Sequence, residues 1–224
     1  KSLFVFSLFS IHITEGDNTL EWLIGGGPIM IPLLLCSVLA LAVIIERAIN
    51  LRRDKILKPE IIQTIEAIHH PEDIPFAISK CEVISGPFSN LLRRILSNNH
   101  LTREEKFIDI QAAGRQESKS LEKRLLVLEV ITAVAPLLGL LGTVLGLESI
   151  FGVISELGLG QAKAFSAGLA EAIRTTVFGL FIAIPSLVAY SYFDKKVDTF
   201  VLEMEEYSMH ILNKLYPAQD RDKR

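Results

Sequence analysis

The chain has 224 residues, of which 50% are hydrophobic and 22% are charged, and its formal net charge at pH 7 is −3. Such a composition requires apolar blocks separated by charged ones, which argues against one or two ordinary soluble domains. No basic patch alternates with aromatic residues, so nothing points to nucleic-acid binding. Cys36 lies in an apolar block and Cys81 in a charged one, and we expect no disulfide between them.

The sequence has no feature typical of an enzyme or a metal centre. There is no CxxC pair, no paired metal-ligand spacing and no glycine-rich phosphate loop. We therefore expect no catalytic residue, no metal and no bound cofactor.

The N-terminal segment, residues 1–21, contains an apolar stretch from Leu3 to Ile13. With roughly 11 residues, this stretch is too short to cross a bilayer. It fits either an interfacial helix or the remains of a targeting segment, and we favour the interfacial helix.

Three apolar blocks are long enough to span a membrane, which takes about 20 residues of helix. They are residues 22–46, 125–155 and 167–193. The second block has an uncharged core from Val130 to Leu147, and the third has one from Thr175 to Phe193. Each block contains proline, which a spanning helix tolerates where its neighbours satisfy the freed carbonyl groups. The sequence therefore predicts an all-α integral membrane protein with three transmembrane helices.

Basic residues gather on one side of the predicted spans. Residues 47–124 and 194–224 place many lysines and arginines next to the spans, whereas the short link at residues 156–166 offers only Lys163. The segment before the first span is more acidic than basic. By the positive-inside rule, the N-terminus is expected outside the membrane and the C-terminus inside.

The region at residues 47–124 is predicted to be helical. Thr102 and Glu105 form a T-x-x-E capping box, and beyond them the pattern meets no proline until Pro136. We therefore predict one long helix from about Thr102 to Ile154, which joins the cytoplasmic region to the second span.

The remaining helices follow from the prolines. The third span is predicted to continue as a helix towards Tyr216, because Pro217 is the next residue that stops it. Shorter helices are expected at residues 59–69 and 88–98, separated by prolines. The C-terminal part, residues 194–224, is expected to be this helix followed by a charged tail.

Small residues recur along the second and third spans. Helices in lipid associate through close backbone approach, which small side chains permit. The glycines assigned to this packing are Gly139, Gly142, Gly146, Gly168 and Gly179.

Polar residues accompany these glycines. They are Thr143, Glu171, Thr175 and Thr176. An ionisable residue at membrane depth is energetically costly and usually faces a partner or a hydrated cavity. We therefore expect these four residues to line a hydrated proton path.

Other interpretations of the same residues stay open. Glu171 can pair with Arg174 three positions on, or lie in water at the outer mouth of the path. The Thr143 hydroxyl can bond to its own helix backbone instead of serving a polar path. Glu148 is expected at the outer interface, and Arg174 and Glu148 are treated as electrostatic modulators.

Two runs in these spans closely resemble a signature of the MotA/TolQ/ExbB proton-channel family. One is APLLGLLGTV at residues 135–144. The other is GLAEA at residues 168–172, followed by Thr175-Thr176, Gly179-Leu180 and Ala183-Ile184-Pro185. In the first span, Gly26-Gly27-Pro28, Cys36 and Glu46-Arg47 look most like the ExbB branch.

The resemblance implies a homopentameric ring around two copies of a single-span partner of the ExbD/TolR type, in a bacterial inner membrane. In that family a transmembrane Asp of the partner accepts the proton, and threonines and a glutamate of this subunit surround it. By motif position these residues are Thr143, Thr176 and Glu171. Protons are then the coupling ion, and their flow performs work on a TonB-like protein that spans the periplasm.

One departure from the usual ExbB pattern is Arg174, where an apolar residue is common. If Arg174 pairs with Glu171, the glutamate would act electrostatically rather than relay protons.

The residues themselves support a shared path on one independent point. Apart from Glu171 and Glu148, the chain has no titratable group at membrane depth, so a path across roughly 30 Å of hydrocarbon needs another chain. We therefore predict a motor subunit of a TonB-type transport system. The alternatives are a TolQ-type role in envelope maintenance, a self-sufficient ion channel and a structural membrane scaffold.

Overall fold

The computed structural model describes residues 26–68, 70–97, 101–157 and 162–216, and all structural statements below refer to these ranges. Every regular element within them is helical. The predicted interfacial helix in residues 1–21 lies outside the described part of the chain, as does the tail from residue 217 onwards.

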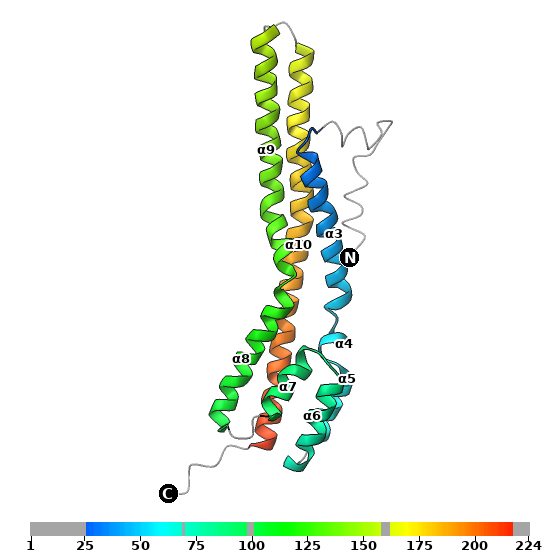
Figure 1. Cartoon of the computed structure of the whole chain (residues 1–224), viewed down its shortest axis with the longest axis vertical. Helices are drawn as coiled ribbons and strands as arrows, with labels where there is room; N and C mark the ends of the chain where they lie inside the picture. The colour runs from blue at the N-terminus through cyan, green and yellow to red at the C-terminus, as the bar shows by residue number, and fades with distance from the viewer. Residues whose placement is uncertain (1–25, 69, 98–100, 158–161, 217–224) are drawn as a thin grey trace. The chain divides into compact units, whose positions relative to one another are not determined.

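The helices follow one another in the chain with short connections (Figure 1). They are α3 (Met30–Asn50), α4 (Arg53–Ile56), α5 (Pro59–Ala67), the 3-10 turn η1 (Pro71–Asp73), α6 (Ile74–Val83), α7 (Pro87–Ser97), α8 (Arg103–Glu122), α9 (Leu125–Leu157) and α10 (Ala162–Leu215).

Three of the described helices are long and apolar enough to cross a membrane. The candidate spans are Met30–Asn50, Leu125–Gly152 and a stretch within Phe165–Leu215. They correspond to the three blocks found in the sequence, so the predicted all-α membrane architecture is confirmed.

The predicted single helix from Thr102 to Ile154 is wrong, because a turn at Lys123 and Arg124 divides it into α8 and α9. The cause lies in a distant side chain. Arg47 Nη1 donates a hydrogen bond to the carbonyl oxygen of Leu121 at 2.9 Å. In an unbroken helix that carbonyl would accept from the amide four residues later. A side chain inserted into the hydrogen-bond ladder is a recognised cause of helix interruption.

The other helix predictions mostly agree with the structure. The helix α10 continues to Leu215, immediately before Tyr216 and Pro217, as expected. The helices α5 and α7 match the two predicted short helices. The helix α6 was not predicted, because Pro75 is one of the prolines expected to separate the short helices at residues 59–69 and 88–98. The structure places Pro75 in the first turn of α6, where the missing N–H is not needed.

The chain divides into two compact units. Among the described residues, the span unit comprises those within 26–45 and 126–191, and the charged unit those within 46–125 and 192–216. The helices α3 and α10 each contribute to both units.

The charged unit has an apolar core to which the amphipathic helix α7 contributes one face. Its buried residues Phe88, Leu91, Leu92, Ile95 and Leu96 follow the i, i+3, i+4, i+7, i+8 spacing of a helix face. The ring of Phe88 lies 5.8 Å, centroid to centroid, from that of Tyr207 on α10. Hydrophobic burial therefore holds this unit together in the usual way.

In the span unit, large aliphatic side chains point outwards. On α3, Ile31, Leu35, Val38 and Leu41 are mostly exposed. On α9, Leu137, Leu140 and Val144 are exposed in the same way. Apolar surface of this extent suits lipid or further protein chains rather than water.

Candidate proton-handling site

The helices α9 and α10 approach each other at glycine. A Cβ added to Gly139 would lie 3.0 Å from the Thr175 carbonyl oxygen and from the Thr176 Cα. A Cβ on Gly179 would lie 2.6 Å from the Ala135 carbonyl oxygen, and one on Gly146 would lie 2.8 Å from the Ala172 Cβ. A backbone cannot move aside as a flexible side chain can, so these contacts require glycine.

Two more of the glycines predicted to pack are also in close contact. A Cβ on Gly142 would overlap the Thr175 side chain, and one on Gly168 would lie 2.5 Å from Ile150 Cγ1. All five glycines assigned to helix packing therefore lie at tight contacts that join α9 to α10.

This close approach brings two predicted residues together. Thr143 on α9 and Thr176 on α10 have their hydroxyl oxygens 2.6 Å apart. Each hydroxyl is also within hydrogen-bond distance of the Gly139 carbonyl oxygen, at 3.1 Å for Thr143 and 3.0 Å for Thr176. Both side chains are only partly buried, so the pair borders a surface that another chain or water can reach.

The hydroxyl pair has two alternative hydrogen-bond arrangements. Three contacts are available, but each hydroxyl supplies only one proton. Either Thr176 donates to the Gly139 carbonyl and Thr143 donates to Thr176, or the roles are exchanged. In each arrangement one hydroxyl oxygen keeps free lone pairs, and rotation of both hydroxyls moves that acceptor from one helix to the other.

Thr175 behaves differently from its neighbour. Its side chain is 1% exposed, and its hydroxyl donates to the Ala172 carbonyl at 2.7 Å within α10. The Gly139 carbonyl lies farther away, at 3.3 Å. This geometry is typical of a packing residue, although the sequence placed Thr175 with the pore-lining group.

Glu171 lies away from the hydroxyl pair, at the beginning of α3. Its Oε1 would be 2.5 Å from a Cβ built on Gly27. Within the described ranges Glu171 forms no ion pair with Arg174, so the Glu171–Arg174 pair considered from the sequence is absent. Glu148 is exposed on α9, and its place at the outer interface stays a prediction.

Sequence reasoning missed Gly27 as a partner of Glu171. Its only signal was a Gly-Gly-Pro run ahead of an apolar helix. Such a run predicts a turn but not the residue that packs on it.

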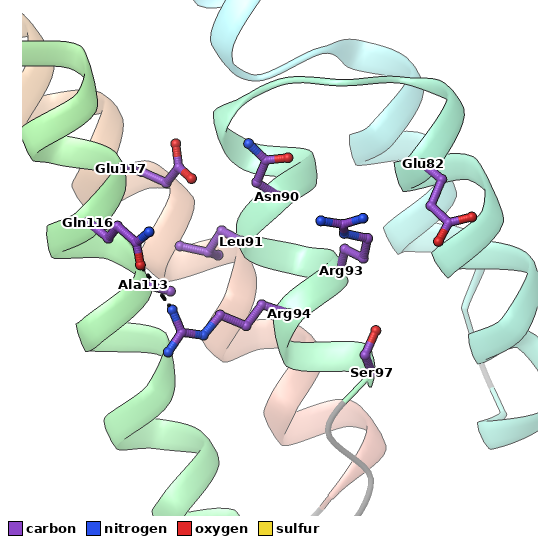
Figure 2. Close-up of a pocket in the computed structure, with 9 residues that line it drawn as sticks. All are labelled: Glu82, Asn90, Leu91, Arg93, Arg94, Ser97, Ala113, Gln116 and Glu117. Carbon is purple, nitrogen blue, oxygen red and sulfur yellow. Dashed lines mark hydrogen bonds between the residues drawn. The ribbon is translucent and has the colours of Figure 1, made fainter.

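The charged unit contains a separate cavity of about 560 Å³ among α6, α7 and α8 (Figure 2). Arg94 reaches across it to donate to Gln116 Oε1 at 3.1 Å and pairs with Asp109 at 2.7 Å. Burial raises the pKa of the Glu117 carboxyl, while a hydrogen bond from Asn90 partly offsets this rise. None of the residues predicted to handle protons lines this cavity.

The geometry defines a class of protein. It is an α-helical membrane protein in which two glycine-packed spans present a threonine hydroxyl pair. The family model described as the MotA/TolQ/ExbB proton channel family matches residues 83–206, which is more than half of the chain. The chain therefore belongs to this family, and the resemblance found in its two motifs is confirmed.

Individual relatives agree. The chain is 32% identical over 174 residues to the putative biopolymer transport protein ExbB-like 3 of Synechocystis, covering 75% of this chain and 81% of that protein. It is 41% identical over 90 residues to the biopolymer transport protein ExbB of Aquifex aeolicus, covering 40% of this chain and 61% of that protein. The Tol-Pal system protein TolQ of Haemophilus influenzae is 36% identical over 86 residues, or 38% of each chain.

These matches set the class of activity. The chain is a multi-pass inner-membrane protein of a family of proton channels that energise transport. The chain spans less than two thirds of the length of the Aquifex protein.

Proposed function

We propose that this chain is the proton-channel subunit of a motor that uses the proton motive force to drive a TonB-type outer-membrane transport system. In this role it works with a single-span partner of the ExbD type, and protons are its coupling ion. The N-terminus faces the periplasm and the C-terminus the cytoplasm, as the distribution of basic residues favours.

The observation that carries the proposal is the Thr143–Thr176 hydroxyl pair. It lies between two spans whose cores carry no charge from Val130 to Leu147 and from Thr175 to Phe193. A hydroxyl can pass a proton on but neither gains a second proton nor loses its own at neutral pH. The pair therefore needs a titratable group supplied by another chain, which fits a partner with a carboxylate at membrane depth.

The assembly follows from the same reasoning. One copy of α9 and α10 exposes one side of the hydroxyl pair and large aliphatic surfaces. A ring of five copies around two partner helices would cover these surfaces and surround the partner carboxylates. Movement of the inner helices would then transmit work to a TonB-like protein, with about 2.3 kcal/mol available per proton per 100 mV.

The decisive experiment compares two adjacent threonines. The full chain is co-expressed with the single-span protein encoded beside it, the complex is reconstituted in liposomes, and proton uptake is followed with a pH-sensitive dye. Thr176→Val removes one member of the hydroxyl pair and should reduce the flux at least about tenfold. Thr175→Val is the matched control, because its hydroxyl bonds within its own helix, and it should retain most of the flux.

Three results would overturn the proposal. One is full flux in Thr176→Val and in Glu171→Ala. Another is equal flux with and without the partner, which would indicate a self-sufficient channel. The third is a pair of results: no proton flux under any condition, and full cellular function of the triple variant of Thr143, Glu171 and Thr176. Together these would indicate a scaffold.

A TolQ-type role in envelope maintenance is the second candidate, because the chain also matches a TolQ protein. Deletion of the chain separates the two roles. Loss of energised uptake across the outer membrane supports the TonB-type role, and a leaky envelope with normal uptake supports the TolQ-type role.

A further inference from the structure

Gly27 is the residue of the span unit with the most unusual backbone among those described. Its φ is +69°, in the left-handed region that residues with a side chain seldom adopt. It lies three residues before Met30, the first residue of α3, and its carbonyl oxygen accepts a hydrogen bond from the Met30 amide at 3.1 Å. The turn at Gly27 therefore sets where α3 begins.

The same residue meets Glu171 of α10. An added Cβ would lie 2.5 Å from Glu171 Oε1 and 3.6 Å from its Cδ. No ordinary Cβ contact is that short, so the carboxylate occupies the space that a side chain at position 27 would need. Gly27 is thus restricted to glycine both by its backbone angle and by this contact.

The contact also places a negative charge near the positive end of a helix dipole. The first turn of α3 carries no acidic residue of its own, and a negative group near the N-terminus of a helix is favourable. The Glu171 carboxylate lies against the turn that precedes this end.

Within α10, Glu171 is connected to the hydroxyl pair. It lies five residues before Thr176 in the same unbroken helix. The contact that holds the Glu171 carboxylate at Gly27 would also restrain the rotation of this part of α10 about its axis. It would thereby restrain the direction in which Thr176 faces.

We propose that Gly27 is a positioning residue of the proton-handling site: its missing side chain leaves the space that the Glu171 carboxylate occupies, and this contact connects α3 to the Thr143–Thr176 pair. The inference rests on the proposed function. It assigns to α3 a part in proton handling, in addition to its place as a membrane-spanning helix.

The test uses asparagine, because Asn tolerates a positive φ better than other residues with a side chain. Gly27→Asn therefore preserves the turn while filling the space that the Glu171 carboxylate occupies. Gly26→Asn is the matched control, because a Cβ there would overlap the buried Met30 side chain, so it crowds the same turn without meeting Glu171. Flux is measured on the full complex in liposomes and divided by the amount of assembled complex.

We expect Gly27→Asn to reduce the flux per complex at least about tenfold, since displacement of a positioned group by about 1 Å has effects of this order. Gly26→Asn should stay within about twofold of the unmodified chain. Combining Gly27→Asn with Glu171→Asp, which shortens the carboxylate side chain, should recover a large part of the flux. A purely structural role of Gly27 would show no such rescue.

The inference and the proposed function can fail separately. If Gly27→Asn and Gly26→Asn have the same flux, or if Glu171→Asp brings no recovery, the inference is wrong while a loss in Thr176→Val still supports the channel. If Thr176→Val and Glu171→Ala keep full flux, the proposed function itself is wrong. Assembly is checked in each case by the mass of the purified complex.

Discussion

The span unit and the charged unit hold their helices together in different ways. In the span unit, α9 and α10 meet backbone to backbone at glycine, and hydroxyl groups bond to a main-chain carbonyl. The described part of this unit contains no ion pair, whereas Arg53–Glu203 and Arg94–Asp109 both lie in the charged unit. Lys106 is also buried there, with its Nζ 3.9 Å from the centre of the Tyr216 ring.

The difference reflects the surroundings of each unit. Between helices in lipid there is no hydrophobic driving force, so close packing and interhelical hydrogen bonds must supply the attraction. In water the burial of aliphatic side chains supplies it, and charged groups adjust the result by small amounts. Tight packing around Thr143 and Thr176 therefore has two consequences at once: it holds the spans together and it aligns their hydroxyls.

The largest expected effect comes from breaking the backbone contact in the span unit. Gly179→Ala should lower the free energy of unfolding by about 2 kcal/mol, because the new Cβ would press on the Ala135 carbonyl oxygen. Gly152→Ala is the control, since a Cβ there meets nothing within 4 Å. It should be neutral or stabilising, as alanine favours a helix over glycine by about 1 kcal/mol. Thermal unfolding in lipid nanodiscs, followed by circular dichroism, gives both values, and equal changes would contradict the glycine contact.

The next effect probes the charged unit. The Thr102 hydroxyl accepts from the Glu105 amide, and the Glu105 carboxylate accepts from the Thr102 amide at 2.8 Å. Thr102→Ala should therefore lower the free energy of unfolding by about 1 kcal/mol. Substitution of the exposed Ser120 by alanine in the same helix should change it little. Chemical denaturation followed by helix content measures the difference, and a Thr102→Ala value no larger than that of Ser120→Ala would exclude a contribution from the cap.

A smaller effect is expected from the hydroxyl pair. Thr143→Val removes the 2.6 Å contact with Thr176 and should lower stability by about 0.6 kcal/mol, a typical value for interhelical hydrogen bonds in membranes. The same variant should strongly reduce proton flux. The pair then contributes far more to transport than to folding, and a stability loss above about 2 kcal/mol with unchanged flux would reverse this conclusion.

The smallest effect concerns pH. Burial raises the pKa of Glu117, so the folded state holds this proton more tightly than the unfolded state does. Stability from this group is therefore present at low pH and is lost as pH rises through the folded pKa. Glu117→Gln cannot ionise and should be more stable than the unmodified chain at pH 7, by about 0.5 kcal/mol or less. Denaturation at pH 4 and pH 7 tests this, since the advantage should disappear at the lower pH.

Much of the architecture could be predicted from the sequence. The three spans follow from uncharged apolar runs, and the start of α8 follows from the Thr102–Glu105 capping box, because both signals are local. The membership of Thr143 and Thr176 in one site was also predicted, from their place among small residues.

What could not be predicted depends on contacts between distant residues. The turn between α8 and α9 depends on Arg47, which lies 74 positions from Leu121. The contact between Glu171 and Gly27 joins α10 to the turn before α3, far away in the sequence. The difference between the buried Thr175 and the partly buried Thr176 depends on how α10 packs against α9 around Gly139. Composition and periodicity contain no information about such pairs.

The hydroxyl pair of Thr143 and Thr176 is also a small electric dipole with two orientations. In one orientation Thr143 of α9 donates to Thr176 of α10, and in the other Thr176 donates to Thr143. Both hydroxyls must rotate to change one orientation into the other, because the hydroxyl that stops donating across the pair accepts there while its partner turns away from the Gly139 carbonyl. A charge brought close to the pair would favour one orientation over the other.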